Sequence, residues 1–116
     1  MSISDSEQKL MELIWENEPM KSGALVILAA EKLGWKKSTV YTVVKKLSVK
    51  GIIKNENAVI SSLRDREDVI GEKSERIISK SYGSLPMFLT AFLSREKLTK
   101  AEAEELKRLI DEYTED

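Results

Sequence analysis

Two short helical segments on either side of a single glycine constrain the fold of this chain most. Residues 23–33 are apolar at almost every position, and residues 38–50 place three valines and a leucine on one face. Gly34 can adopt the left-handed backbone that ends a helix, and only the turn at residues 34–37 separates the two segments. Two short helices joined by a glycine-containing turn form a helix-turn-helix. The pattern therefore predicts this motif in the first half of the chain.

The second of these helices has two faces of different chemistry. Val40, Val43, Val44 and Leu47 recur at helical spacing and predict a buried stripe. The opposite face carries small hydroxyl side chains and an aromatic ring near its beginning, followed by lysines: Ser38, Thr42, Lys45 and Val49, flanked by Tyr41 and Lys46. Recognition helices have this arrangement, because their N-terminal residues meet base edges while neighbouring cations hold phosphates.

The segments around this motif predict a winged helix. Ser4 and Glu7 have the spacing of a capping box that opens a first helix, and Glu18-Pro19 ends it. Downstream, residues 52–54 and 58–63 are rich in β-branched side chains and flank an asparagine-rich turn at residues 55–57. This pattern predicts a short β-hairpin, and a hairpin directly after a recognition helix is a wing.

The second half of the chain predicts three further helices. The first spans about residues 66–82 and ends at Gly83. Ser84 is placed to cap a short second helix, and Thr99 with Glu102 forms another capping box that opens the last one. We therefore expect a mainly α protein, with a winged helix-turn-helix DNA-binding domain at residues 1–65 and a helical dimerisation domain at residues 66–116.

The helices of the second half have strong apolar faces and no other element to cover them. A self-contained three-helix bundle is one alternative, but it would be small and marginally stable. A two-fold partner supplies the missing surface, and two-fold dimers are the commonest oligomers. The candidate interface residues are Leu85, Phe88, Leu89, Phe92, Leu93, Leu106, Leu109, Ile110 and Tyr113.

Charge is distributed unevenly along the chain, although the formal net charge is only −1. Residues 32–55 contain seven lysines and no acidic residue, whereas residues 100–116 contain three basic and seven acidic residues. Salt screens fields beyond roughly 8–10 Å, so a partner responds to the local patch and not to the net charge. The basic block therefore predicts binding to double-stranded DNA.

The candidate DNA contacts divide into two groups. The candidates for phosphate contacts are Lys36, Lys37, Lys45, Lys46 and Lys54, and those for the major groove are Ser38, Thr39, Tyr41 and Thr42. Two alternatives stay open. The lysines could form only a solvated face, and the winged helix could bind another protein through its apolar second helix or its C-terminal arm.

The composition argues against catalysis and metal binding. The chain has no cysteine and no histidine, which excludes disulfides, thiolate chemistry and ordinary zinc or copper sites. Asp65, Glu67 and Asp68 lie close together, but arginines alternate with them and no calcium-loop or phosphate-loop spacing is present. We expect neither an enzyme nor a cofactor. The longest apolar run, residues 24–30, is too short to span a bilayer, and no secretory signal opens the chain, so we expect a cytoplasmic protein.

Landmarks along nearly the whole chain match one known family. Those of the first half are Ile3-Ser4 with Glu7, Trp15, Pro19, Gly34-Trp35, Thr39-Val40, Thr42, and Leu47 with Lys50-Gly51; those of the second are Ser84-Leu85, Phe92, Leu98-Thr99 and Glu104-Glu105-Leu106. In these residues the chain resembles the BlaI/MecI-type penicillinase and methicillin-resistance repressors. The resemblance implies a winged-helix transcriptional repressor that binds a palindromic operator as a homodimer.

The chain departs from this family at positions that bear on function. In the family a Ser-Pro pair, then Lys-Thr and a later threonine, contact DNA; here Lys36 and Lys37 replace Ser-Pro and Ser38 replaces the lysine, while Thr39 and Thr42 match. The charge is thus shifted toward the turn, which implies a different operator preference. The wing is shorter and lacks the basic tip of the family.

The resemblance also bears on how such a repressor is switched off. In the family a membrane-bound protease sensor cuts before a phenylalanine in the dimerisation helix, and Ala91-Phe92 occupies that place here without the usual asparagine. The resemblance therefore implies this sensor as a further partner. Copper-responsive relatives carry C-terminal cysteines, which this chain lacks, so metal sensing is not expected.

Overall fold

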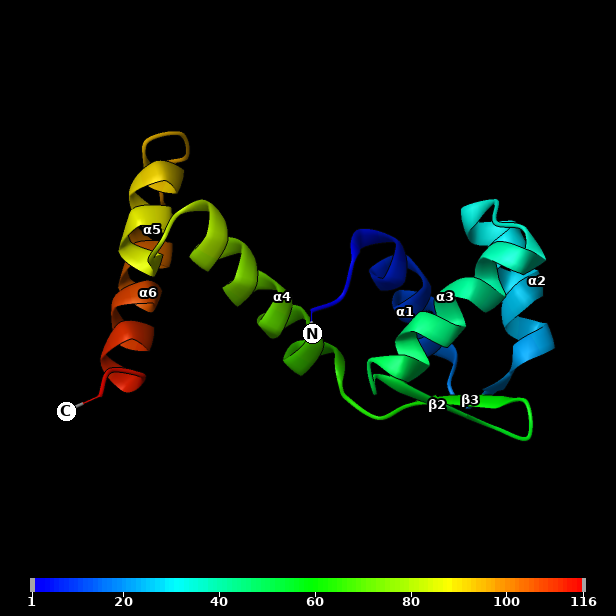
Figure 1. Cartoon of the computed structure of the whole chain (residues 1–116). Helices are drawn as coiled ribbons and strands as arrows, with labels where there is room; N and C mark the ends of the chain where they lie inside the picture. Colours follow the sequence, from blue (N-terminus) through cyan, green and yellow to red (C-terminus); the bar gives the residue numbers. More distant parts are fainter. Residues whose placement is uncertain (1, 116) are drawn as a thin grey trace. The chain divides into compact units, whose positions relative to one another are not determined.

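The computed structural model describes residues 2–115, which fold into two compact units (Figure 1). The first unit extends to Arg76 and the second begins at Ile77. The elements, in chain order, are α1 (Asp5–Asn17), β1 (Met20–Lys21), α2 (Ser22–Leu33), α3 (Lys37–Val49), β2 (Ile53–Glu56), β3 (Val59–Ser62), α4 (Arg66–Ser81), α5 (Leu85–Leu93) and α6 (Lys100–Glu112). The predicted winged helix-turn-helix followed by helices is confirmed.

The first unit begins and turns where the sequence predicts. The capping box of α1 is present, because Ser4 accepts from the amide of Glu7 and the Glu7 side chain accepts from the amide of Ser4. Glu18 is extended and ends the helix. Gly34 has a left-handed backbone with φ 68° and ends α2, and its amide donates to the carbonyl of Ala30. These local signals place α3 at a sharp angle after α2, as the helix-turn-helix requires.

The wing contains one strand more than the sequence predicts. The sheet has the order β1-β3-β2 with antiparallel pairing, and the two-residue strand β1 pairs Met20 with Ile60. The predicted turn at residues 55–57 begins two positions too early and ends one too early, because Asn55 and Glu56 continue β2 and the turn consists of Asn57 and Ala58. Both turn residues have positive φ, 53° and 61°, as a tight two-residue hairpin turn requires.

The core of the first unit is formed by apolar side chains from every element around it. Its largest fully buried members are Leu10, Met11, Ile14, Leu25, Val40, Leu47, Ile52, Ile53, Ile60 and Val69. α2 is buried on one face only: Leu25 and Ala29 lie in the core, whereas Ile27 is 63% exposed. A helix this apolar is expected either to be buried on more than one side or to face a partner. The described part of the chain does not bury α2 on more than one side.

The first half of α4 packs against the winged helix. Val69 enters the core with 2% exposure, and the indole Nε1 of Trp15 donates to the carbonyl of Arg64 just before α4. Arg66 pairs with Glu12 of α1, and Lys73 pairs with Asp5. The division of function between residues 1–65 and 66–116 stays a prediction.

The second unit contains the end of α4, α5 and α6. Ser84 caps α5 through the amide of Met87, and the predicted capping box of Thr99 and Glu102 opens α6. Tyr82 and Phe88 meet edge to face with ring centroids 5.2 Å apart. Within residues 77–115 no side chain of α5 or α6 is fully buried. No helix in the described part of the chain is long and apolar enough to cross a membrane.

Candidate nucleic-acid interface

The faces of α3 are divided as the sequence predicts. Val40, Val43, Val44 and Leu47 are buried, with exposed fractions between 0 and 7%. Ser38, Thr39, Thr42 and Lys45 lie on the exposed side of the same helix. The valine stripe thus attaches α3 to the core and leaves the hydroxyl and lysine face open.

The candidate phosphate-binding lysines are all exposed. Lys36 and Lys37 lie where the turn meets α3, Lys45 and Lys46 lie toward the C-terminal end of α3, and Lys54 lies on β2. Among the described residues none of the five forms an ion pair. Lys37 approaches the ring of Tyr41, with its Nζ 5.8 Å from the centroid. A set of unpaired ammonium groups on one exposed helix and its flanks creates a local positive potential.

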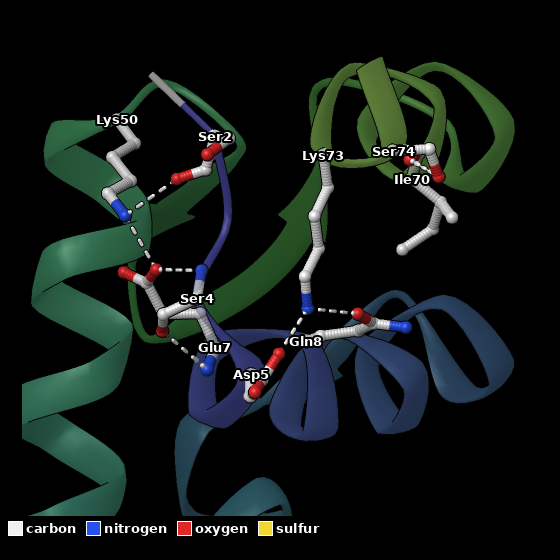
Figure 2. A network of polar contacts seen from close by, with 9 residues as sticks. All are labelled: Ser2, Ser4, Asp5, Glu7, Gln8, Lys50, Ile70, Lys73 and Ser74. Carbon is white, nitrogen blue, oxygen red and sulfur yellow. Dashed lines mark hydrogen bonds and ion pairs between the residues drawn. The ribbon is translucent and has the colours of Figure 1, made fainter. Parts of the chain in front are cut away.

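Lys50, the lysine that ends α3, differs from these five because it turns inward (Figure 2). Its Nζ lies 2.6 Å from Oε1 of Glu7 and 3.1 Å from the carbonyl oxygen of Ser2, to which it donates. Glu7 is only 2% exposed. The ammonium of Lys50 is therefore neutralised inside the fold and does not contribute to the exposed basic face.

The pKa of Glu7 reflects this pair. Burial is the largest influence on it and raises the pKa, but the hydrogen bonds from Lys50 and Ser4, with the positive charge of Lys50, together outweigh burial and lower the pKa below its ordinary value of 4.5. The other carboxylate oxygen, Oε2, is buried without a hydrogen-bond partner in the described part of the chain. Glu7 is thus held ionised against a desolvation cost.

The hydroxyl groups on the exposed face of α3 are not equivalent. The Oγ1 of Thr42 donates to the carbonyl of Ser38 at 2.9 Å. The Thr42 side chain therefore presents its methyl group and the lone pairs of its hydroxyl oxygen outward. The hydroxyls of Ser38 and Thr39 make no hydrogen bond within residues 2–115. Thr42 can therefore accept from a base edge or contact a thymine methyl, whereas Ser38 and Thr39 are able to donate.

An open groove of about 380 Å³ runs along one side of this face. It is lined by Ser6 of α1, Trp35 of the turn, and Ser38, Thr39, Thr42 and Lys46 of α3. Trp35 is half-buried and packs against the core, as Trp15 does. The groove thus joins the first turn of α1 to the candidate DNA face. Ser6 is not predictable from the sequence, because nothing in the local pattern distinguishes it from other serines near a helix start.

The candidate dimer residues lie in the second unit and are partly or largely exposed. Their exposed fractions include 53% for Leu85, 43% for Phe92, 49% for Ile110 and 82% for Tyr113. Phe88, Leu89 and Leu106 are half-buried. Phe88 and Phe92 lie with ring centroids 6.1 Å apart. Among the residues described, no group of three or more acidic side chains is arranged to hold a metal ion.

Comparison with known proteins decides the family. The sequence profile of the penicillinase repressors matches residues 3–112. The chain belongs to the penicillinase repressor family. A solved structure that resembles this family member is the solution structure of the monomeric form of BlaI from Bacillus licheniformis, in complex with the blaP half-operator. Its TM-score is 0.51 at 24% sequence identity, over 59% of this chain and 88% of that chain, which shows a shared fold. No curated protein sequence matches significantly.

Proposed function

We propose that this member of the penicillinase repressor family represses transcription by occupying a pseudo-palindromic DNA operator as a homodimer. The observation that carries the proposal is the exposed face of α3, where five lysines without ion pairs in the described chain flank unburied hydroxyls. The BlaI structure of similar fold is a complex with a half-operator, which supports DNA as the partner here.

The residues of this face take two roles in the proposal. Lys36, Lys37, Lys45, Lys46 and Lys54 neutralise backbone phosphates, which supplies affinity but no sequence preference. Ser38, Thr39, Tyr41 and Thr42 contact base edges in the major groove. Because Thr42 donates to the carbonyl of Ser38, its contribution is an acceptor and a methyl group. It therefore favours a base that presents a donor or a methyl group.

The second unit supplies the dimer contact in this proposal. Leu85, Phe92, Leu109 and Ile110 expose between 42 and 53% of their surface in the single chain. A two-fold partner buries these side chains and sets two α3 helices about 34 Å apart, one helical turn of DNA. Two half-sites in inverted orientation then match the symmetry of the protein.

Proteolytic inactivation at Ala91-Phe92 has a structural requirement. Both residues lie inside α5, whose amides and carbonyls are engaged in the helix. A protease acts on transiently opened backbone, so the last turn of α5, which contains this bond, must unfold before it is cut. A membrane-bound protease sensor as partner therefore requires a local opening of this helix.

Charge reversal on α3 tests the proposal. The variant Lys45→Glu/Lys46→Glu is expected to weaken binding to operator and random duplexes alike, by roughly 100-fold. The slope of log affinity against log salt is expected to become shallower by about 2 per half-site. Thr42→Ala is expected to weaken operator binding about tenfold and random binding little. Fluorescence anisotropy with labelled duplexes across a salt series measures both.

A matched control and a rival function complete this test. Lys97→Glu/Lys100→Glu makes the same change of net charge at exposed positions of the second unit and is expected to leave half-site binding unchanged. The rival function is a winged helix that binds another protein and no DNA. Equal binding by the wild type and the α3 variant, or no binding by the wild type, would establish that the α3 face is not a DNA interface.

A further inference from the structure

The groove between α1 and α3 has the chemistry of a phosphate site. Its lining includes the hydroxyls of Ser6, Ser38 and Thr39 and the ammonium of Lys46, and no carboxylate. None of these hydroxyls has a hydrogen-bond partner, and Lys46 has no ion pair, within residues 2–115. Hydroxyl donors and an ammonium, gathered from two helices without a competing anion, suit a phosphodiester oxygen.

The acidic residues on either side of Ser6 are turned to other partners, as Figure 2 shows. Oδ1 of Asp5 lies 2.5 Å from Nζ of Lys73 on α4, and Oε1 of Glu7 lies 2.6 Å from Nζ of Lys50. Each carboxylate is therefore neutralised by a lysine that does not line the groove. The two ion pairs remove the repulsion that Asp5 and Glu7 would otherwise exert on an anion beside Ser6.

The position of the groove indicates where on the DNA this phosphate lies. Ser38, Thr42 and Lys46 are spaced four residues apart and form one row along α3, beside the row of Thr39 and Val43. Because Ser6 lines the same groove, this side of α3 faces the first turn of α1. An oxygen between Ser6 and Lys46 therefore meets the α1 side of the recognition face, while Ser38, Thr39 and Thr42, which line the same groove, keep the base-edge contacts proposed above.

We propose that this groove binds one backbone phosphate of the operator strand that flanks the half-site, with Ser6 and Lys46 as its principal ligands. Ser6 is then a DNA contact supplied by α1, outside the recognition helix and its turn. The proposal rests on the DNA binding proposed above and adds to it a fixed point that sets how α3 enters the major groove. A phosphate contact from a second element restricts the rotation of α3 about its own axis.

Substitutions of Ser6 with opposite charge test this site. Ser6→Glu is expected to weaken half-site binding at least tenfold, and Ser6→Lys to strengthen it and to raise the salt slope by about 1. Ser6→Ala is expected to weaken binding about threefold through the loss of one hydrogen bond. Glutamate in the first turn of a helix is favourable to folding, so Ser6→Glu keeps α1 intact, which circular dichroism and thermal unfolding check.

The chain offers a position-matched control. Ala101 holds in α6 the place that Ser6 holds in α1, two residues after the capping Ser or Thr and one before the capping-box glutamate. Ala101→Glu adds the same charge to an exposed site of the second unit and is expected to leave half-site binding unchanged. If Ser6→Glu and Ala101→Glu bind the half-site as tightly as the wild type does, Ser6 is not a contact.

Neutral backbone linkages identify the phosphate itself. Methylphosphonate placed at single positions along the half-site is expected to weaken the wild type wherever a lysine contacts a phosphate. At one flanking position it is expected to have no further effect on Ser6→Glu. If no position loses its effect in this variant, the groove does not hold a backbone phosphate.

Inorganic phosphate at constant ionic strength distinguishes a free anion from the DNA backbone. The backbone site predicts no inhibition beyond that of chloride, because one free phosphate lacks the other contacts of the duplex. Specific inhibition that Ser6→Glu abolishes would assign the groove to a free anion and overturn the proposal. A wild type that binds no duplex overturns this proposal together with the proposed function, whereas tight binding that is insensitive to Ser6 overturns this one alone.

Discussion

At the scale of single residues, the ion pair of Glu7 and Lys50 joins the beginning of α1 to the end of α3. The carboxylate is 2% exposed, and its Oε1 accepts from both the Lys50 ammonium and the amide of Ser4, at 2.6 and 2.7 Å. Removal of one partner from a buried pair leaves an uncompensated charge, which costs more than the pair contributes. This pair therefore fixes the end of the recognition helix against α1 and makes both residues structural.

The first prediction concerns this pair and is tested with a double-mutant cycle. Lys50→Met is expected to lower the free energy of unfolding by about 3 kcal/mol at pH 7, because it leaves Glu7 buried and ionised. In the background Glu7→Gln, which keeps the shape but not the charge, the same substitution is expected to cost about 1 kcal/mol. Urea unfolding measures all four proteins. Equal costs in the two backgrounds would show that the charges are not coupled.

The pair also has a pH dependence whose sign follows from the pKa of Glu7. The folded protein holds this pKa below 4.5, so the stabilisation is fully present above that pH and is lost as the pH falls through the lowered value. In Lys50→Met only the hydrogen bonds with Ser4 still offset burial, and the pKa of Glu7 rises. The difference in unfolding free energy between wild type and Lys50→Met should therefore shrink as the pH falls from 7 to 4.

Sequence alone could not separate Lys50 from the exposed lysines. It belongs to the same basic block, and its partner lies 43 residues away, so no local spacing connects them. The capping box of Ser4 and Glu7 was predictable because it is complete within four residues. The ion pair of the same glutamate with Lys50 was not predictable. The position of Ser6 beside α3 was not predictable for the same reason, since α3 is distant from Ser6 in sequence.

At the scale of elements, the wing turn and the end of α2 share a backbone conformation but not a residue type. Asn57 and Ala58 have φ 53° and 61°, and Gly34 has φ 68°. A left-handed backbone is unfavourable for alanine and almost free for glycine. Hairpin turns of two residues accordingly favour Asn-Gly, so the wing turn is less stable with Asn-Ala than it would be with Asn-Gly.

This difference predicts opposite effects for two exchanges between glycine and alanine. Ala58→Gly is expected to stabilise the protein by about 1 kcal/mol and to raise the Tm by a few degrees. Its carbonyl still accepts from the amide of Ser22 at 2.8 Å, because that contact is made by backbone. Gly34→Ala is expected to destabilise by a similar amount, although no atom lies within 4 Å of its added Cβ. Differential scanning calorimetry measures both, and a shift of the same sign in both variants would contradict this account of the turns.

The sequence predicted elements well where a local signal marks their ends. Helices begin at both capping boxes and at the Ser84 cap, and they end at left-handed glycines, within a few residues of the predicted positions. β1 was missed because two residues are too short for a periodic pattern, and it exists only through its pairing with β3. The turn was misplaced because Asn57-Ala58 lacks the glycine that usually identifies a hairpin of this kind.

At the scale of the whole molecule, the two units differ in how they use their apolar residues. The first encloses a core of fully buried side chains, whereas α5 and α6 bury none completely within residues 77–115. The surplus of exposed apolar side chains in the second unit was predictable from the sequence. It follows from the number of apolar helix faces, without knowledge of which residues are in contact. In the proposed dimer, the contacts of these side chains depend on the second chain, and no pattern within one chain determines them.

The final prediction concerns the proposed dimer interface. Ile110→Glu places a charge on the apolar face of α6, at a side chain that is 49% exposed in the single chain, so the variant is expected to fold but not to associate. Sedimentation should give the 13.2 kDa monomer for the variant and twice that mass for the wild type.

Binding should change in one respect only. The variant is expected to bind an isolated half-site like the wild type but to lose at least about 100-fold in affinity for the full palindrome, because the second half-site no longer binds as part of the same molecule. Ala101→Glu, on the opposite face of the same helix, controls for the added charge and should sediment as the wild type does. A wild type that stays monomeric at micromolar concentration and yet binds the palindrome more tightly than the half-site would show that the DNA itself, and not the apolar face of the second unit, brings the two copies together.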